Sequence, residues 1–508
     1  MNRAGWRTPA AGVVSGILFA LAFPPFGWVV LLPLALVPWL VALAREESRW
    51  RALLSGLLFG LTTWCLSISW ITYVVTHFGG QGRAMGVVCL VLLAAILAEW
   101  PAAVAFTAVA CAPAGSPRRL AVFPVLWMAS EHLRSFVYGG FPWNLTGNAL
   151  YQRPVWLQTA SVGGVYLVGG LLVAVSCLLA AAVAFRRAKP LVAAAILVLA
   201  AGAFGAARLA RRPSDGAAPT LSVALLQPNV SQESRLGGSA GEVYERVIGM
   251  ARDAAAEEPN LLVIPESAFP IYWDRSPRLR QDLSGVAGAA SGFVIFNDVE
   301  ELPDGRYFNV ARLLGPSGLV GPPYRKVHRV PFGEYVPLPR LFFFVRQVST
   351  EIGEFSAAAA PTTLEMPGAR IGIGVCYEIL YAGLVREEAS RLGANLLVTI
   401  SNDSWYGRAG AQEQHFAGAV LRAVETQRYL LRAAITGISG IVDEKGRIVG
   451  ELPRDTSGIL RGTARLESAR TFWTRWGYWL PRLADVFAGA VLLFGVAGLA
   501  HGRRRRSS

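Results

Sequence analysis

Long apolar runs fill roughly the first 210 residues of this 508-residue chain and its last 25 or so, and they restrict its fold more than any other feature. Several approach the ~20 consecutive apolar residues that an α-helix needs to cross a bilayer. Only 16% of the residues are charged, whereas soluble domains average about 25%. We therefore predict a multi-span α-helical membrane domain of about eight helices. The eight candidate spans cover residues 9–23, 28–44, 52–75, 84–112, 120–137, 157–185, 190–207 and 483–501.

The N-terminal runs are the least regular of these. The stretch "PPFG", which contains Pro24 and Pro25, separates the first two runs, so this pair is either a re-entrant hairpin or two short spans. A cleavable secretory signal would be followed by a soluble chain, but further apolar runs follow here. The N-terminus is therefore interpreted as part of the membrane domain.

The basic residues indicate how the spans are oriented. They gather at both termini and in alternate connections, as the positive-inside rule requires of cytoplasmic segments. The cytoplasmic groups are Arg3 and Arg7; Arg45, Arg49 and Arg51; Arg118 and Arg119; Arg186, Arg187 and Lys189; and Arg503 to Arg506. This pattern places residues 208–482 outside the cytoplasm. The same pattern accounts for the net charge of +14, so nucleic-acid binding is not needed to explain it. The sequence also contains no zinc-finger spacing and no glycine-rich phosphate-binding loop.

The segment between the last two spans is typical of one soluble α/β domain. Apolar runs that stop at polar residues predict buried strands, and helical patterns follow at 241–257 and 411–428. The predicted strands are 221–229, 260–267, 291–298, 369–378 and 394–403. We expect three parts: transmembrane helices in 1–212, a catalytic domain in 213–470, and an interfacial segment, last helix and basic tail in 471–508.

Three strand ends predicted in this domain each supply one reactive side chain. "VIPES" contains Glu266, "YRKVH" contains Lys326 and "GVCYE" contains Cys376. Cys376 is the one cysteine of five outside the apolar runs, so a disulfide framework is not expected. Taken alone, a cysteine usually packs in the core, a glutamate usually caps a helix or lies on the surface, and a lysine is usually a solvated surface charge. Because sites form at the carboxyl ends of strands in α/β sheets, however, the combination predicts one cleft.

The order and spacing of these residues resemble the Glu-Lys-Cys triad of the nitrilase, or carbon–nitrogen hydrolase, superfamily. Together with "KVHRVPFGEYVP", "ISNDSWYG" and "RAVETQRYLLRA" and with spans on both sides, they resemble the apolipoprotein N-acyltransferase family over essentially the whole chain. The resemblance implies an αββα sandwich. One departure is residues 229–238, where this family leads us to expect a tryptophan that is absent.

The resemblance also implies the roles of the residues. Cys376 would be the nucleophile, Glu266 the general base and later the general acid, and Lys326 a donor to the oxyanion. Glu334 would be a second essential carboxylate, which orients Lys326 or the incoming amine; its alternative is a structural salt bridge. Tyr377 and Glu378 would support the site, with ordinary packing or capping as the alternative.

The implied reaction passes through a thioester. The acyl chain would come from the sn-1 position of a phospholipid, commonly phosphatidylethanolamine, and the acceptor would be the α-amino group of an apolipoprotein's S-diacylglyceryl cysteine. No metal or cofactor is expected, and we expect a monomer. The location would be the bacterial inner membrane, with the catalytic domain on the periplasmic side.

Three further segments would meet the membrane. Residues 338–348 carry an apolar cluster between two arginines, which is typical of an arm dipping into the interface, or else of a segment packed on the core. Residues 470–482 alternate aromatic and basic side chains, as an interfacial belt does. Glu99 lies inside a predicted span, where a carboxylate faces protein or water; we interpret it as structural or pocket-lining.

Two other functions remain open on the sequence. A membrane-anchored amidase or nitrilase would use the same three residues with water as the acceptor. It would need only a single anchor, so the eight predicted spans argue against it. A transporter with a soluble ligand-binding part would need paired ionisable residues within its helices, and it would leave the triad unexplained.

Overall fold

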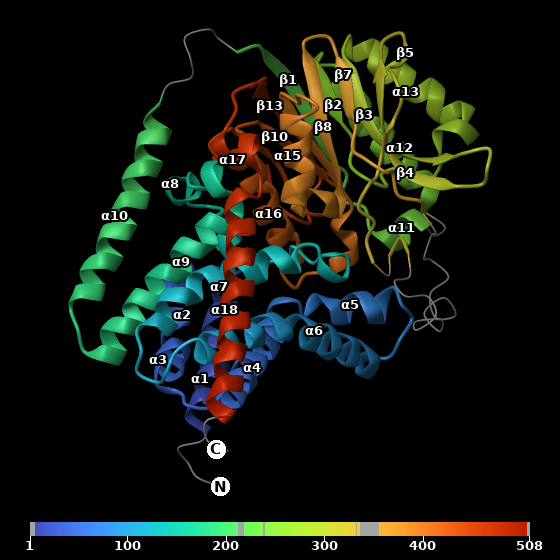
Figure 1. Ribbon diagram of the computed structural model, residues 1–508. Helices are drawn as coiled ribbons and strands as arrows, with labels where there is room; N and C mark the ends of the chain where they lie inside the picture. Colours follow the sequence, from blue (N-terminus) through green and yellow to red (C-terminus); the bar gives the residue numbers. More distant parts are fainter. Residues whose placement is uncertain (1–5, 212–217, 237–238, 332, 336–354, 505–508) are drawn as a thin grey trace. The chain divides into compact units, whose positions relative to one another are not determined.

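The computed structural model describes residues 6–211, 218–236, 239–331, 333–335 and 355–504 (Figure 1). The chain divides into two compact units. Met1–Thr72, Arg83–Arg211 and Trp476–Ser508 form the first, and Tyr73–Gly82 with Arg212–Arg475 form the second. The predicted interfacial arm, residues 338–348, lies outside the described residues, so its placement stays a prediction.

The first unit is built from α-helices. They are α1 (Arg7–Leu21), α2 (Leu32–Ala35), α3 (Val37–Arg45), α4 (Arg49–Ser67), α6 (Arg83–Ala110), α7 (Arg118–Arg134), α8 (Pro154–Leu157), α9 (Ala160–Phe185), α10 (Lys189–Ala210) and α18 (Trp479–Arg504), with 3-10 turns η2 (Val29–Leu31), η3 (Val137–Gly139) and η4 (Thr146–Leu150). Helix α5 (Trp70–His77) begins in the first unit and ends in the second. All eight predicted spans contain helix. Within the described residues, three helices (α6, α9 and α10) are long and apolar enough to cross a membrane, and a fourth span arises if α4 and α5 count as one. The number eight therefore stays a prediction.

Two predicted spans are divided into separately bounded helices, and a third, 157–185, has a kink within α9 at Gly163 and Gly164. The run 28–44 divides into η2, α2 and α3, and a proline stands in the first turn of both α2 and α3. Proline has no amide hydrogen, so it begins a new helix more readily than it continues an old one. The run 52–75 breaks between α4 and α5 with a bend of 58°. Neither proline nor glycine lies at this break, so the sequence held no signal for it.

Glycines bring three helices of the first unit into close contact. A Cβ atom on Gly56 or Gly60 of α4 would lie 2.5 Å from the Cα atom of Ala102 or Ala98 of α6. On α1, Gly12 and Gly16 stand equally close to main-chain atoms of α4. Both glycine pairs are spaced four residues apart, so they share one face of their helix. Small residues at this spacing allow the close helix contact found in membrane proteins.

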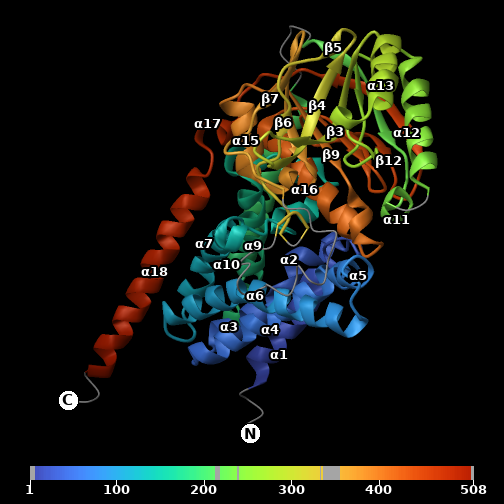
Figure 2. The ribbon, with the colours of Figure 1, turned by 90° about the vertical axis from the view of Figure 1, so that its right-hand side faces the viewer.

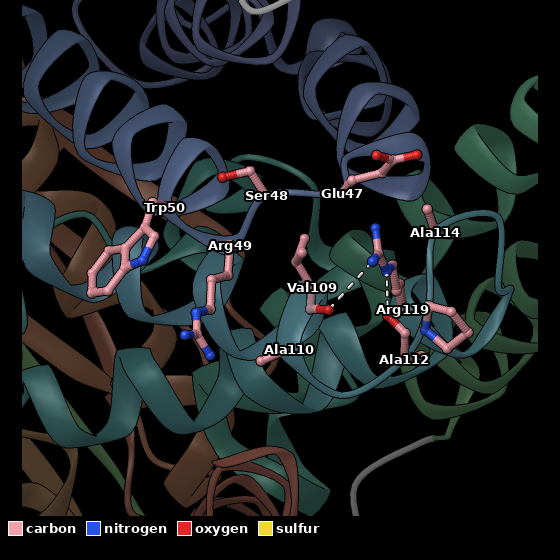
Figure 3. Close-up of a pocket in the computed structure, with 10 residues that line it drawn as sticks. Glu47, Ser48, Arg49, Trp50, Val109, Ala110, Ala112, Ala114 and Arg119 are labelled. Atoms are coloured by element: carbon pink, nitrogen blue, oxygen red, sulfur yellow. Dashed lines mark hydrogen bonds between the residues drawn. The ribbon is translucent and has the colours of Figure 1, made fainter. Parts of the chain in front are cut away.

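An open hollow of about 510 Å³ lies beside the beginning of α4 (Figure 3). At its edge the buried guanidinium of Arg119 donates to the main-chain oxygens of Leu43, Glu46 and Ala112, which joins the end of α3 to the α6–α7 connection. None of the described residues that line the hollow is a predicted site residue. The predicted chemistry therefore belongs elsewhere in the chain.

The second unit contains two β-sheets. The seven-stranded sheet has the order β13-β1-β2-β3-β4-β5, with β6 paired to β4, and the six-stranded sheet has the order β12-β11-β10-β9-β8-β7. The strands are β1 (Thr220–Gln227), β2 (Leu261–Val263), β3 (Phe293–Glu301), β4 (Tyr307–Gly315), β5 (Gly318–Leu319), β6 (Tyr324–Arg325), β7 (Thr363–Met366), β8 (Ala369–Val375), β9 (Leu396–Ser401), β10 (Leu430–Ala434), β11 (Ser439–Val442), β12 (Ile448–Leu452) and β13 (Gly458–Arg465). Strands β1, β2 and β3 are parallel, as are β8, β9 and β10.

The five predicted strands are all present. The one at 260–267 is the most shortened, because β2 ends at Val263 shortly before Pro265, and proline cannot donate to a ladder. The predicted helices correspond to α12 (Ala240–Ala255) and α16 (Ala411–Thr426). The remaining helices are α11 (Gln232–Leu236), α13 (Pro277–Ala290), α15 (Ala382–Ser390) and α17 (Phe472–Trp476), with 3-10 turns η5 (Trp273–Arg275), η6 (Cys376–Leu380) and η7 (Asp403–Tyr406).

The two sheets pack face to face between helices. Along β1, Val223 and Leu225 join an apolar core with residues of β8, β9 and β10, while Ala224 and Leu226 join a core with α12 and α13. This alternation buries both faces of the strand, as its unbroken apolar run predicts. Helices α15 and α16 pack on the second sheet (Figure 2). The result is a nitrilase-like α/β domain with two sheets inside and helices outside, as expected.

The glycine contacts predict a specific loss of stability. Gly60→Ala places a methyl group against the main chain of α6, and overpacking of this kind costs about 1–3 kcal/mol. Gly489→Ala in α18 is the matched control, because its Cβ would meet nothing within 4 Å. We expect the first variant to lower the Tm of the detergent-purified protein by several degrees and the second to leave it unchanged or raised. Equal Tm values would contradict close packing between α4 and α6.

Candidate active site

Cys376 lies directly after β8 and begins η6. Its φ of 57° is in the left-handed region, which non-glycine residues adopt only where their surroundings impose it. Val375, the residue before the cysteine, pairs with Ile400 of β9 and donates its N–H to Glu378, so its backbone is fixed. The Cys376 side chain is 5% exposed. The thiol is therefore held in one place at the end of a central strand.

Glu266 follows β2 and is 6% exposed. Both of its carboxylate oxygens accept hydrogen bonds. Oε2 accepts from the main-chain N–H of Asn402 at 2.9 Å, and Oε1 accepts from Nδ2 of Asn309 at 3.0 Å. Asn402 follows β9 in the second sheet, so this carboxylate of the first sheet is bonded across the sandwich.

Lys326 follows the short strand β6 and is 1% exposed. Its main-chain N–H donates to Asn309, and its carbonyl accepts from Ala358, which fixes the backbone on both sides. The Nζ atom donates to Oε1 of Glu334 at 2.9 Å and lies 3.8 Å from Oε1 of Glu266. One buried ammonium is thus shared between two carboxylates.

Asn309 on β4 joins the same two carboxylates. Its Nδ2 donates to Oε1 of Glu266 and to Oε1 of Glu334, each at 3.0 Å. Nδ2 of Asn297 donates to its Oδ1 at 2.7 Å, which fixes which end of the amide faces the carboxylates. Oε2 of Glu334 accepts from the N–H of Val330 at 2.8 Å. The two carboxylates are therefore held by an amide as well as by Lys326.

Glu378 is fully buried two residues after the nucleophile. Oε1 accepts from the main-chain N–H groups of Val327 and His328 at 2.7 and 2.9 Å. Oε2 accepts from the N–H of Val375 at 2.9 Å and from the Tyr324 hydroxyl at 3.0 Å. These four bonds join the Lys326 segment to the Cys376 segment.

Tyr377, the other predicted supporting residue, is buried and packs edge-on against the ring of Tyr381 at a centroid distance of 5.3 Å. Tyr381 in turn stacks on His328 at 4.0 Å. The structure thus places Tyr377 in an aromatic cluster beside the Lys326 segment.

The electrostatics of the site favour a neutral thiol at rest. Burial, together with the charge of Glu266, raises the pKa of the Cys376 thiol. Burial also raises the pKa of Glu266 above its ordinary value of 4.5, although the charge of Lys326 opposes the shift. Burial alone would lower the pKa of Lys326, but the charges of Glu334 and Glu266 outweigh it, so this pKa is raised and the ammonium stays protonated. A thiol in this setting needs a base that takes its proton as it attacks.

A second group of buried polar residues lies behind the nucleophile. Cys376, Asp403 and His415 bring one potential metal ligand each to within 4.8 Å of one another. Nη2 of Arg432, however, donates to Oδ2 of Asp403 at 2.6 Å and lies 3.2 Å from Nδ1 of His415. The guanidinium occupies the position that a cation would need, so the donor set does not fit a metal ion.

The structure brings the predicted residues together in the second unit. Glu266, Lys326 and Glu334 are in direct contact, the charges of Glu266 and Lys326 act on the Cys376 thiol, and Glu378 joins two of the segments. Asn309 was not predicted, because it is a polar residue inside a strand and its neighbours in the sequence give no chemical signal. Nor was Gln232, which lies in the segment where a tryptophan was expected and accepts from Asn402 Nδ2 at 3.1 Å.

Comparison with known proteins matches two parts of the chain to known families. The description "Apolipoprotein N-acyltransferase N-terminal domain" matches residues 15–178, and "Carbon-nitrogen hydrolase" matches residues 222–472. The apolipoprotein N-acyltransferase of Geobacter metallireducens is 36% identical over 97% of this chain and 95% of its own length. The apolipoprotein N-acyltransferase of Methylococcus capsulatus is 31% identical over 98% of this chain and 96% of its own length. Among solved structures, Saccharomyces cerevisiae Nit3 of the nitrilase superfamily covers 55% of this chain and 97% of its own at 20% identity, with a TM-score of 0.38.

Matches of this identity, over nearly the whole length of both chains, show the family. The chain belongs to the apolipoprotein N-acyltransferases, which are acyltransferases of the nitrilase superfamily.

Proposed function

We propose that this enzyme moves an acyl chain from the sn-1 position of a phospholipid to the α-amino group of an S-diacylglyceryl cysteine at the N-terminus of an apolipoprotein. The reaction runs in two half-reactions through a thioester on Cys376. The observation that carries the proposal is the buried ammonium of Lys326, shared between Glu266 and Glu334, in a chain of this family.

The first half-reaction forms the thioester. Glu266 takes the thiol proton, and Sγ of Cys376 attacks the sn-1 ester carbonyl of the donor, commonly phosphatidylethanolamine. The ammonium of Lys326 donates to the oxyanion of the tetrahedral intermediate. The C–O bond then breaks, Glu266 returns the proton to the leaving oxygen, and lysophospholipid departs. Cys376 is left as a neutral thioester.

The second half-reaction uses the same groups in the same order. Glu266 takes a proton from the attacking amine, and Lys326 again donates to the oxyanion. The C–S bond breaks, the proton passes to the sulfur, and the product is an amide. The chemistry proceeds by proton transfer and nucleophilic attack, with no change of oxidation state at any step.

The remaining predicted residues fix these groups in place. Glu334 and Asn309 hold Lys326 and Glu266 at a constant separation. Glu378 faces four donors of its own fold, so we assign it to joining the two catalytic segments instead of to contact with either substrate. Tyr377 supports the same segments through its aromatic neighbours.

The proposed location is the bacterial inner membrane, where both lipid substrates reside. The helices of residues 1–212 and of the C-terminal segment 471–508 span it, and residues 213–470 act on the periplasmic side as the catalytic domain of a monomer. The apolar helices α6, α9 and α10 support membrane insertion. The aromatic side chains of Phe472 and Trp476 are exposed just before α18, as an interfacial belt requires.

Trapping of the thioester tests the mechanism. Purified enzyme incubated with labelled phosphatidylethanolamine and no acceptor should accumulate label on Cys376, detected by mass spectrometry of the Cys376 peptide. Cys376→Ala should give none, and Glu266→Gln should give none because it keeps the shape and removes the base. Lys326→Ala should lose about 100- to 1000-fold in rate, the usual cost of one oxyanion donor.

The acceptor separates transfer from hydrolysis in the same experiment. Adding a diacylated lipopeptide should discharge the thioester to an N-acylated peptide, with lysophospholipid formed in equal amount. Release of free fatty acid at the same rate with and without peptide would show an amidase-like hydrolase. Label that accumulates normally on Glu266→Gln would show that another group is the base.

The pH dependence follows from the state of Glu266. The base works as the carboxylate, and its pKa is raised above 4.5 by burial, so thioester formation should fall as pH drops through a midpoint above 4.5. Lys326 should cause no loss on the alkaline side in the neutral range, because its pKa is raised above 10.5. Single-turnover rates across a pH series measure both limbs. A rate that is constant down to pH 4.5 would contradict Glu266 as the base.

Fusion reporters test the topology. A reporter that is active only outside the cytoplasm should be active when fused after Arg212 and silent when fused after Ser508. The physical reason is the excess of Arg and Lys in the segments assigned to the cytoplasm. The reverse pattern would place the catalytic domain on the cytoplasmic side.

A further inference from the structure

Behind Cys376 lies a buried polar network that the mechanism above does not use. Its members are Ser401 at the end of β9, Asp403 in η7, His415 on α16 and Arg432 on β10, and none of them has exposed surface. The network reaches Cys376 at two atoms. Oγ of Ser401 lies 3.5 Å from Sγ, and Nε2 of His415 lies 3.1 Å from the main-chain oxygen.

The first arm of the network ends at the sulfur. The hydroxyl of Ser401 donates to Oδ1 of Asp403 at 2.7 Å. A hydroxyl has one proton, so the Ser401 oxygen keeps its lone pairs for the thiol hydrogen of Cys376. The direction of this contact is set by Asp403, a carboxylate that only accepts when it is ionised.

The second arm ends at the backbone. A carbonyl oxygen only accepts, so Nε2 of His415 must carry the proton that it donates to Cys376. Nδ1 of His415 lies 3.0 Å from Oδ1 of Asp403 and 3.2 Å from Nη2 of Arg432. Burial and the charge of Arg432 lower the pKa of His415, although Asp403 opposes the shift, so the ring is neutral and its Nδ1 accepts from Arg432. Nη2 of Arg432 has two N–H groups, one for Nδ1 of His415 at 3.2 Å and one for Oδ2 of Asp403 at 2.6 Å. Among the described residues, Nη1 of Arg432 is the one nitrogen of this network that is buried without a hydrogen-bond partner.

Two arguments separate this network from ordinary core packing. A buried ion pair adds little stability compared with apolar residues of the same size, so the Asp403–Arg432 pair is not explained by stability alone. Secondly, the carbonyl that His415 holds belongs to a residue in the left-handed conformation, which costs free energy unless its surroundings fix it. The backbone at Gly437 also lies close against the carboxylate, since a Cβ there would lie 2.1 Å from Oδ2 of Asp403.

We infer that Ser401 and His415, both anchored by the Asp403–Arg432 pair, are positioning residues that aim the Cys376 sulfur at the acyl carbonyl. Ser401 fixes the side chain and His415 fixes the backbone. This inference deepens the proposed function and rests on it for the identity of the acyl donor.

The test compares thioester formation in Ser401→Ala, His415→Ala and His415→Gln. A misplacement of about 1 Å can cost about 100-fold in rate, so we expect the two alanine variants to form the thioester about 10- to 100-fold more slowly at an unchanged KM for the phospholipid. Gln at 415 keeps an N–H donor for the Cys376 carbonyl, so His415→Gln should recover part of the loss. Ser439→Ala is the matched control, because Ser439 is equally buried but bonds to the main chain of Ala434; it should retain the normal rate.

Alkylation of Cys376 by iodoacetamide supplies a second readout. This small reagent needs no fixed approach, so the alanine variants should be alkylated at nearly the normal rate while their acylation is slow. Asp403→Asn adds an electrostatic signature. The thiol is affected by the charges of Glu266, Lys326 and Asp403, so removing the last should move the alkylation profile to lower pH although acylation becomes slower.

The outcomes decide between the possibilities. Alanine variants that acylate at the normal rate would overturn the inference, as would equal losses in acylation and alkylation, which would indicate thiol activation instead of aim. If His415→Gln forms the thioester no faster than His415→Ala, His415 does not act by holding the Cys376 carbonyl. Wild-type protein that forms no thioester with phospholipid would contradict the proposed donor only, and the burst of p-nitrophenol from p-nitrophenyl acetate then tests the same variants.

Discussion

The catalytic centre depends on one buried cation. Lys326 lies beside Glu266 and Glu334, two carboxylates that also share the amide of Asn309. Without the ammonium, two buried carboxylates this close would not both stay ionised. Without the carboxylates, the buried ammonium would lose its proton for the same reason. Removal of one partner from such a group costs about 3–5 kcal/mol, so each charge holds the others in the state that the chemistry needs.

The two sheets supply different parts of this centre. The first carries Glu266 after β2, Asn309 on β4 and Lys326 after β6, and the second carries the nucleophile after β8. The contacts that cross the sandwich at this centre include Asn402 N–H to Glu266, and Glu378 to the segment after Lys326. The distance between base and nucleophile therefore depends on how the apolar core between the sheets is packed. Catalytic geometry and core stability are coupled in this domain.

The sequence predicted the parts of the fold and site that leave a local signal. Unbroken apolar runs that stop at Glu266 and Cys376 marked buried strands whose ends carry chemistry, and the membrane helices were visible from length and hydropathy. Asn309, Ser401 and His415 left no such signal, because an amide within a strand, or a histidine on a helix, acquires its meaning from residues 25 to 43 positions away. The bend after Ser67 was missed because neither proline nor glycine marks it.

The raised pKa values of the Cys376 thiol and the Glu266 carboxyl are explained by the charges of the whole site. At rest the site holds Glu266 as an anion, Lys326 as a cation and Cys376 as a neutral thiol. When the proton moves from Cys376 to Glu266, the negative charge moves to the sulfur and the net charge stays the same. Burial disfavours both anions, since it raises the pKa of each group, so much of the desolvation cost cancels between the two states. The charge of Lys326 acts on both the Glu266 carboxylate and the Cys376 sulfur. It also stabilises the negative charge when that charge passes to the oxyanion. A base that is itself destabilised by burial is therefore better matched to this thiol than an ordinary surface glutamate would be.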